Sequence, residues 1–379
     1  MIVAGATRPL GLAGKLLRLN WPLLLLTASS ASLGFLMLYS VAGGDLEPWA
    51  GRQMTRFGVG FAGMMVVALI DIRFWRAMAP LAYAFGLALL AAVELIGVVG
   101  MGAQRWIDLG PIQLQPSEIM KVALVMALAA YYAWLPPERV SRPLWLLPPI
   151  MLTLAPVALT LMQPDLGTAL LLLAGGAVMI FLAGAHWLYF AVGTAGAVSL
   201  VWLVLSSRGT PWQLLKDYQF RRIETFLDPS TDPLGAGYHI TQSKIALGSG
   251  GFSGRGFMQG TQSRLNFLPE KHTDFIFTAL AEEFGFVGAA GLLSLYVLIL
   301  VFCGLSAITN RDRFGALVTA GVGAVFFTYF FVNMAMVMGL APVVGVPLPL
   351  VSYGGSAMLV ILFALGLAQS AHIHRPAAV

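Results

Sequence analysis

Long apolar runs separated by short polar segments repeat along the whole of this 379-residue chain. A helix needs roughly 20 apolar residues to span a bilayer, and about ten of the runs approach that length. The runs are Pro22–Ala42, Phe57–Ile70, Met78–Val99, Ile119–Trp134, Leu146–Met162, Leu166–Ala183, Trp187–Leu205, Phe284–Ile308, Phe314–Met338 and Ala357–Ser370. The pattern predicts an all-α polytopic integral membrane protein with about ten transmembrane helices.

Composition supports this prediction. Hydrophobic residues make up 58% of the chain and charged residues 10%, whereas soluble domains average about 25% charged residues. A net charge of +5, spread over the loops, argues for membrane topology and against a nucleic-acid partner. The single cysteine, Cys303, excludes an intramolecular disulfide. The first twenty residues lack an apolar core, so no cleavable signal peptide is expected.

Lys and Arg residues in the short loops predict the orientation, because cytoplasmic loops are enriched in them. With a cytoplasmic N-terminus, ten fall inside: Arg8, Lys15, Arg18, Arg73, Arg76, Arg139, Arg142, Arg311, Arg313 and Arg375. Four fall outside: Arg52, Arg56, Arg105 and Lys121. We therefore expect one transmembrane domain over residues 1–379, with both termini cytoplasmic. The long loop of residues 206–273, before the eighth helix, is then extracytoplasmic.

Several polar motifs fall on the outer side in this topology. They are Gly102–Gly110, Gln115–Glu118, Gln163–Asp165, Asp274 and Val351–Ser356, and the last four open the fourth, sixth, eighth and tenth spans. The N-terminus of a helix offers unpaired N–H groups and a positive dipole end, which suit phosphate. With Arg105 and Lys121 nearby, we expect these helix ends to form an outward cleft for an anionic, membrane-embedded substrate.

Asp274 stands where a polar loop becomes a membrane helix, directly after Glu270, Lys271 and His272. An ionised carboxylate at that depth is costly, and such residues are usually functional. His272 is expected to be a hydrogen-bonding loop residue, since no second His or Cys stands at metal-binding spacing.

Other polar residues have structural alternatives. Glu118 and Lys121 lie at i and i+3 on one helix face and could form a buried structural pair instead of contacting substrate. Asp165, after a proline, could be an N-cap only. Glu94, which this pattern places deep in the third span, has no assigned role. Glu282–Glu283 is expected to shape the start of a helix and not to take part in chemistry.

The long loop has its own pattern. Apolar residues recur at helical spacing between Trp212 and Phe226, with basic residues between them, which predicts an interfacial helix. Tyr238–Leu247, which carries Lys244, predicts a second short helix. The glycines of Gly248–Gly256 follow no strand and so are not a dinucleotide fingerprint. They predict a flexible loop.

These residues resemble the SEDS family of cell-wall polymerases (shape, elongation, division and sporulation), over nearly the whole chain. The resemblance rests on Gln219–Asp232, Leu234–Ile245, Gly248–Gly260, Gln262–Gly285 and, in the family's order, Asn333, Gly339, Pro342, Gly345 and Ser352–Ser356. The phrases NFLPEKHTDFIF and SYGGSA favour the RodA branch over the FtsW branch.

The resemblance implies a peptidoglycan glycosyltransferase that polymerises lipid II by β-1,4 transfer during cell elongation, in the bacterial inner membrane. Asp274 matches the family's essential acid, and a single base can suffice because a diphosphate leaves without being protonated. Mg²⁺ or another divalent cation could assist on the diphosphate; no organic cofactor is expected. The candidate substrate-binding residues are Arg105, Trp106, Glu118, Lys121, Gln163, Asp165, Lys244, Lys271, Ser352, Gly354 and Gly355.

The main alternative is a flippase that moves lipid II across the membrane, which would need polar groups through the midplane and on both sides. A non-catalytic scaffold would leave Asp274 unexplained. The resemblance also implies a class B penicillin-binding protein as partner, beside other elongation-complex membrane proteins. Its single helix could dock on small residues of the ninth span, or those residues could serve packing within the bundle. They are Gly315, Ala316, Ala320, Gly321, Gly323 and Ala324.

Overall fold

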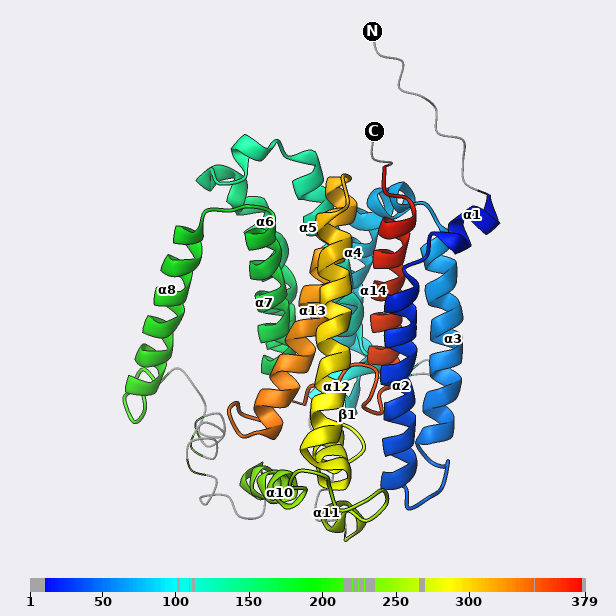
Figure 1. Ribbon diagram of the computed structural model, residues 1–379. Coiled ribbons are helices and arrows are strands. Elements are labelled where there is room, and N and C mark those ends of the chain that lie inside the picture. Colours follow the sequence, from blue (N-terminus) through cyan, green and yellow to red (C-terminus); the bar gives the residue numbers. More distant parts are fainter. Residues whose placement is uncertain are drawn as a thin grey trace.

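In the computed structural model, long helices stand side by side in one bundle (Figure 1). The structure describes residues 11–376, apart from 101, 102, 109, 111, 112, 214–219, 221–223, 225–227, 229–235, 266–269 and 344. The predicted interfacial helix between Trp212 and Phe226 lies mostly outside the described residues.

The predicted spans are present as helices. They are α2 (Trp21–Val41), α3 (Ala50–Leu69), α4 (Ile72–Ile96), α5 (Pro116–Trp134), α6 (Pro143–Met162), α7 (Leu166–Leu182), α8 (Trp187–Ser206), α12 (Ile276–Ile308), α13 (Arg313–Val337) and α14 (Gly355–Ile373). Within the described ranges, 8 helices are long and apolar enough to cross a membrane. The helix α3 starts seven residues earlier than expected, because a helix can continue through polar residues at the membrane surface.

Shorter elements connect the spans. They are α1 (Leu12–Leu17), η1 (Pro137–Arg139), α10 (Ala236–Ser249), α11 (Thr261–Arg264), β1 (Val98–Gly100), β2 (Ala103–Asp108) and β3 (Gln113–Leu114). The predicted helix Tyr238–Leu247 is confirmed by α10. The three strands form an antiparallel sheet in the order β1-β2-β3. The expected third span therefore ends too late: α4 ends at Ile96, and Val98 begins a strand that the apolar pattern did not reveal.

The two ends of the described chain lie at the same end of the bundle, at the top of Figure 1. There Lys15 donates to the carbonyl of Leu69 at 2.7 Å. Asn20 and Gln369 exchange two hydrogen bonds, of 2.9 and 3.0 Å. The helices α10 and α11 lie at the opposite end. The two ends of the chain lie at the same end of the bundle because the chain crosses the bundle an even number of times.

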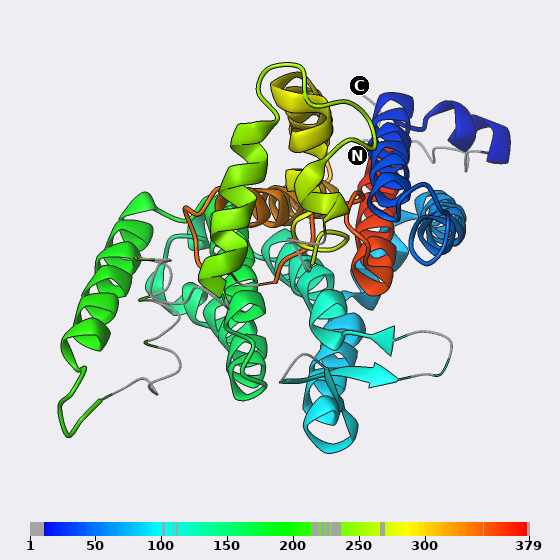
Figure 2. The ribbon, with the colours of Figure 1, turned by 90° about the horizontal axis from the view of Figure 1, so that it is seen from below.

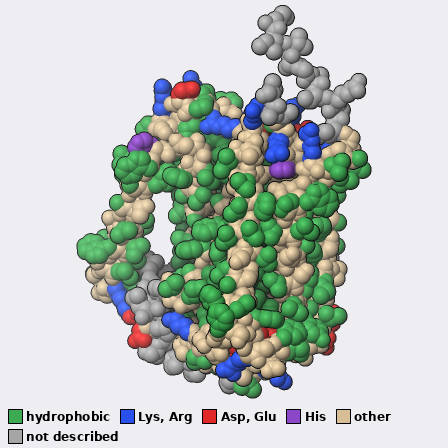
Figure 3. Space-filling model, viewed as in Figure 1, with side chains coloured by type: hydrophobic (Ala, Val, Ile, Leu, Met, Phe, Trp, Pro, Cys, Tyr) green, Lys and Arg blue, Asp and Glu red, His purple; other side chains and the backbone are tan. Residues whose placement is uncertain are grey.

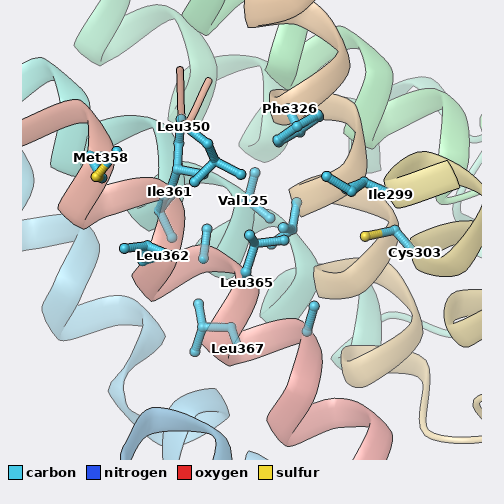
Figure 4. Close-up of a cluster of buried hydrophobic side chains, with 14 of the residues drawn as sticks. Val125, Ile299, Cys303, Phe326, Leu350, Met358, Ile361, Leu362, Leu365 and Leu367 are labelled. Carbon is cyan, nitrogen blue, oxygen red and sulfur yellow. The ribbon is translucent and has the colours of Figure 1, made fainter. Parts of the chain in front are cut away.

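The centre of the bundle is apolar and closely packed. Side chains from α5, α12, α13 and α14, among them Val125, Ile299, Phe326 and Leu365, meet in one cluster (Figure 4). By contrast, α8 has no buried residue and stands at one side of the bundle (Figures 1 and 2). Hydrophobic side chains cover much of the flank, with Lys and Arg toward both ends (Figure 3). This surface is what a protein surrounded by lipid requires.

Two of the small residues of α13, Gly321 and Gly323, pack inside the bundle. A Cβ on Gly321 would lie 2.5 Å from both Met179 Sδ and Val125 Cγ1. A Cβ on Gly323 would lie 3.3 Å from Cys303 Cβ. Of the two alternatives for these glycines, a docking face and close packing between neighbouring spans, the structure supports the second.

The helix α12 is broken near its start, at Gly285, where φ is 64° and ψ is −158°. The freed backbone pairs with the glycine-rich loop: Arg255 N donates to Glu282 O and Gly256 N to Glu283 O, both at 3.0 Å. A Cβ on Gly254 would lie 2.1 Å from Glu283 O. The prediction of a flexible loop at Gly248–Gly256 is therefore wrong, because the glycines allow close backbone contact.

The adjacent carboxylates hold this arrangement in place. Glu282 accepts hydrogen bonds from the backbone N of Thr261 at 2.8 Å and of Gln262 at 3.1 Å. Glu283 accepts one from Ser40 Oγ at 2.5 Å and one from Met258 N at 3.1 Å. Both carboxylates are buried. Their partners are loop and helix groups of the protein itself, which agrees with the expected structural role.

Candidate active site

Asp274 lies in a tight turn, residues 270–275, that leads into α12. Within the turn, the backbone N of Thr273 and that of Phe275 both donate to Glu270 O at 3.2 Å. Thr273 Oγ1 also donates to Glu270 Oε2 at 2.8 Å. Phe275 and Ile276 are fully buried. The apolar side chains thus hold the end of the turn in the bundle. Of the polar residues before them, Lys271 is buried and the others are half-buried.

The surroundings of Asp274 disfavour its charged form. Burial, and secondarily the negative charge of Glu270, raise the pKa of Asp274 to about 6. Burial lowers the pKa of Lys271 and of His272. A carboxylate with this pKa is still largely ionised at neutral pH, yet it binds a proton more readily than an exposed aspartate. That combination suits a general base.

Two elements hold the backbone beside Asp274. The side-chain N–H groups of Asn333, on α13, donate to Asp274 O at 2.9 Å and to Val346 O at 2.7 Å. Gly345 has a φ of 67°, and a Cβ there would lie 3.6 Å from Asp274 Oδ2. The segment between α13 and α14 therefore runs directly past the carboxylate.

The start of α14 contacts the same turn. Ser352 Oγ donates to Thr273 O at 2.6 Å, and Tyr353 N donates to His272 O at 2.9 Å. The His272 ring stacks on Trp49 with ring centroids 4.5 Å apart, and its Nδ1 is buried without a hydrogen-bond partner among the described residues. The predicted hydrogen-bonding role of this histidine stays a prediction. Gln53 Nε2 donates to Ser352 O at 2.9 Å. The N-terminal ends of α3, α12 and α14 thus meet.

Gly354 and Gly355 open α14, and a cation lies over this helix end. The guanidinium carbon of Arg56 is 4.9 Å from the centroid of the Tyr353 ring. It would lie 3.3 Å from a Cβ placed on Gly355. Sequence reasoning counted Arg56 only as a loop charge. Arg56 stands four residues after Arg52 on α3, so the helical spacing shows that the two side chains share a face. The spacing does not show which residues that face contacts.

A second polar group joins α5 to α13. Lys121 Nζ donates to Glu118 Oε1 at 2.7 Å and to the hydroxyl of Tyr329, which in turn donates to Glu118 Oε2. The Lys121 ammonium also lies 4.1 Å from the centroid of the Tyr329 ring. All three side chains are buried. The expected pair exists, and Tyr329 is a third member that the spacing of Glu118 and Lys121 does not reveal.

The sheet contributes to a third group. Arg105 on β2 lies with its Nε 3.6 Å from Asp165 Oδ2 and donates to Pro164 O at 2.7 Å. Asp165 also accepts a hydrogen bond from Thr168 N at 3.2 Å, so it is the N-cap of α7. Trp106, the next residue on β2, is half-buried, and consecutive strand residues point to opposite faces of a sheet.

The remaining candidates lie around these groups. Gln163 is buried and donates to Leu90 O at 2.8 Å. Lys244 is exposed on α10, and its Cε would lie 2.4 Å from a Cβ on Gly339. Glu94 lies in the last turn of α4 and is exposed. The prediction that Glu94 is deep in the membrane is wrong, because the helix ends at Ile96.

The helix α13 connects the groups. Tyr329, which contacts Glu118, and Asn333, which contacts the Asp274 turn, are four residues apart and so share one helix face about 6 Å apart along the axis. The four helix ends that the sequence placed on one side therefore come together in two pairs, α5 with α7 and α12 with α14, with α13 between them.

An apolar groove of about 820 Å³ runs along α12, from Phe277 to Leu298. Phe277, three residues after Asp274, lines one part of it, and Leu298 lines another along α12. Leu247 of α10 and Met338 after α13 complete its sides. The groove gives an apolar chain a place to lie along α12, the helix that follows the polar turn.

The comparisons with known proteins identify the family. The family model FTSW_RODA_SPOVE, described as "Cell cycle protein", matches residues 21–376. The chain belongs to this family, the SEDS family. It is 42% identical over 345 residues to the peptidoglycan glycosyltransferase MrdB of Escherichia coli K12, covering 90% of each chain. It is 37% identical over 361 residues to a probable peptidoglycan glycosyltransferase FtsW of Trichlorobacter lovleyi, covering 91% of each.

Solved structures of SEDS relatives have the same fold. The crystal structure of Thermus thermophilus rod shape determining protein RodA matches with a TM-score of 0.71 at 30% identity, over 95% of this chain and 98% of that one. A chain from a structure described as "Structural coordination of polymerization and crosslinking by a peptidoglycan synthase complex" matches with a TM-score of 0.80 at 34% identity. That match covers 93% of this chain and 97% of that one.

Proposed function

We propose that this SEDS protein is a peptidoglycan glycosyltransferase that polymerises lipid II into glycan strands during cell elongation, with Asp274 as the general base. The observation that carries the proposal is the carboxylate of Asp274. Its pKa is raised to about 6, its turn is held by α13 and by the segment before α14, and an apolar groove runs along α12, the helix that follows the turn. The MrdB relative is named for the same activity.

The chemistry needs one base. The 4-hydroxyl oxygen of the acceptor sugar attacks the anomeric carbon of the donor, and Asp274 accepts the hydroxyl proton. The new β-1,4 bond forms as the bond from the anomeric carbon to the diphosphate oxygen breaks, and the lipid diphosphate leaves with the electron pair. No acid is required at the leaving group, unlike in glycoside hydrolysis.

The leaving diphosphate needs positive charge instead. We propose that Arg105, Arg56 and the N-terminus of α14 at Gly354 and Gly355 supply it, with Lys244 and Lys271 at the margin of the site. Both Lys121 and Arg105 have a carboxylate partner, but Lys121 is buried 2.7 Å from Glu118, whereas Arg105 is half-buried and 3.6 Å from Asp165. The contribution of Lys121 is therefore the weaker one. The polyprenyl tail requires apolar surroundings, and the groove along α12 offers them.

We also propose that a divalent cation binds at the site together with the diphosphate. Within the described residues, no group of three His, Cys, Asp or Glu side chains could hold a metal ion. Mg²⁺, however, often binds through one or two carboxylates together with substrate phosphates. Glu270, whose charge acts on Asp274, is the carboxylate that would hold it. When bound, the ion would neutralise charge on the diphosphate.

A flippase would need polar groups along a path through the membrane. Among the described residues, the buried charged side chains are Glu118, Lys121, Asp165, Lys271, Glu282 and Glu283. All of them lie in the outer parts of their helices in the expected topology or in the loops there, and Glu94 lies at that end as well. This distribution favours an enzyme that acts at one membrane face.

We further propose that both termini are cytoplasmic, that the Asp274 end faces outward, and that a class B penicillin-binding protein cross-links the product. The positive charge of the short loops supports the orientation. The structure described as a peptidoglycan synthase complex, of polymerisation and crosslinking, supports the partner.

The test is Asp274→Asn, assayed with labelled lipid II and purified protein in detergent, where flipping has no meaning. The change is nearly isosteric, so folding and lipid binding should persist. General base catalysis typically contributes 10²–10⁴-fold, and polymerisation should fall by at least about 100-fold. Activity above about a tenth of the wild-type rate would remove Asp274 from this role.

A further inference from the structure

Asn333 and Ser352 have no obvious chemistry of their own, yet both are buried beside the Asp274 turn. The two N–H groups of the Asn333 side chain are both occupied, one by Asp274 O at 2.9 Å and one by Val346 O at 2.7 Å. A side-chain amide has only these two donors. Asn333 therefore has no side-chain N–H donor left for a substrate.

Ser352 is occupied in the same way. Its hydroxyl donates to Thr273 O at 2.6 Å and accepts from Leu348 N at 2.7 Å. A serine hydroxyl has a single O–H donor, so Ser352 cannot also donate to an anionic substrate. This geometry argues against the substrate-binding role that the sequence suggested for Ser352.

We infer that Asn333 and Ser352 are positioning residues that clamp the consecutive carbonyl groups of Thr273 and Asp274, and so set the direction of the Asp274 carboxylate. The inference rests on the proposed role of Asp274 as the base. The two carbonyls flank the backbone of Asp274, and fixing both limits rotation of the residue between them. Each anchor comes from a different element: Asn333 from α13, and Ser352 from the segment before α14.

Such a clamp should affect the rate of the chemical step. A displacement of about 1 Å can cost about 100-fold in rate, because the reacting atoms leave the attack geometry. Binding of the substrate's tail and diphosphate involves other residues and should change little. Loss of either anchor should therefore lower kcat and leave KM for lipid II nearly unchanged.

The experiment measures kcat and KM for Asn333→Ala and Ser352→Ala with labelled lipid II. We expect kcat to fall about 10- to 100-fold and KM to stay within about twofold. Asn310→Ala is the matched control. Asn310 is also buried and makes two hydrogen bonds, to Ala371 O and from Asp312 N, both at 3.0 Å, but at the opposite end of the bundle. It should leave kcat unchanged.

Two further variants separate positioning from folding. Ser352→Thr keeps the hydroxyl and should recover most of the kcat that Ser352→Ala loses. On the Asp274→Asn background, Asn333→Ala should cause no further loss, because it acts through Asp274. Folded Asn333→Ala and Ser352→Ala proteins with wild-type kcat, or equal losses on both backgrounds, would overturn the clamp. An active Asp274→Asn protein would instead overturn the base, so the two failures are distinguishable.

Discussion

Two carboxylates four residues apart, Glu270 and Asp274, differ in how the fold treats them. Glu270 accepts a hydrogen bond from Thr273 Oγ1 at 2.8 Å. At Asp274, loss of solvent contact and the charge of Glu270 together raise the pKa of the carboxyl to about 6. Burial disfavours the charged form, and a neighbouring negative charge adds to the effect. The residue with the perturbed pKa is the one that the proposed mechanism uses, as is common in active sites.

This raised pKa predicts the pH dependence of the reaction. The base must be ionised to accept a proton, so kcat/KM should fall as the pH drops through about 6. Replacing Glu270 by Gln removes a negative charge beside Asp274, which lowers the pKa of Asp274 and shifts the acid limb to lower pH. Glu47→Gln is the control, because Glu47 is exposed and pairs with Arg52 at 3.3 Å. An unshifted limb in Glu270→Gln would contradict the electrostatic link.

For the group formed by Glu118, Lys121 and Tyr329, we expect a double substitution to affect stability and turnover differently. Lys121→Met leaves the Glu118 carboxylate buried without its cation, and breaking a buried pair costs about 3–5 kcal/mol. Adding Glu118→Gln should restore most of that stability, measured as the melting temperature in detergent. We expect turnover to stay reduced in the double variant, because a cation near the diphosphate is lost. Full recovery of turnover would show that Lys121 serves only as a structural partner.

At the level of elements, the start of α12 shows how local sequence can mislead. The apolar pattern places the start of this span at Phe284, next to the break at Gly285, but a further helical stretch that begins at Ile276 and includes Glu282 and Glu283 precedes the break. The two carboxylates are tolerated because loop and helix groups donate to them. The partners are 20 or more residues away in sequence, so the polar residues alone could not show that they are satisfied.

The glycine-rich loop yields a matched pair of substitutions. Gly254→Ala should destabilise the protein by about 1–3 kcal/mol, since φ is +81° and a Cβ would lie 2.1 Å from Glu283 O. Gly248→Ala should be neutral or slightly stabilising, because Gly248 is helical and a Cβ there meets nothing within 4 Å. Melting temperatures in detergent measure both. Equal melting temperatures would mean that the loop does not constrain the helix break.

For the whole molecule, the proposed orientation can be tested by labelling cysteines in intact cells with a membrane-impermeant maleimide. Ser253→Cys lies on the exposed loop at the Asp274 end, and Ser141→Cys on the exposed loop between α5 and α6 at the other end. Only Ser253→Cys should react. The native Cys303 is buried and gives little background. Labelling of Ser141→Cys alone would reverse the orientation and place Asp274 in the cytoplasm.

The sequence by itself determined the fold class and the approximate positions of the spans, because a bilayer requires long apolar segments whatever they pack against. It also placed Asp274 where a polar loop gives way to a membrane helix and made the family recognisable. These properties depend on residues close together in the chain.

Only the tertiary structure decided how the polar residues are used. Tyr329 joins Glu118 and Lys121 from more than 200 residues away, and Asn333 and Ser352 reach the Asp274 turn from other elements. The glycine-rich loop is held by backbone contacts with α12. A hydrogen bond or close packing depends on positions in space, and neither hydrophobic periodicity nor motif spacing specifies which distant groups will meet.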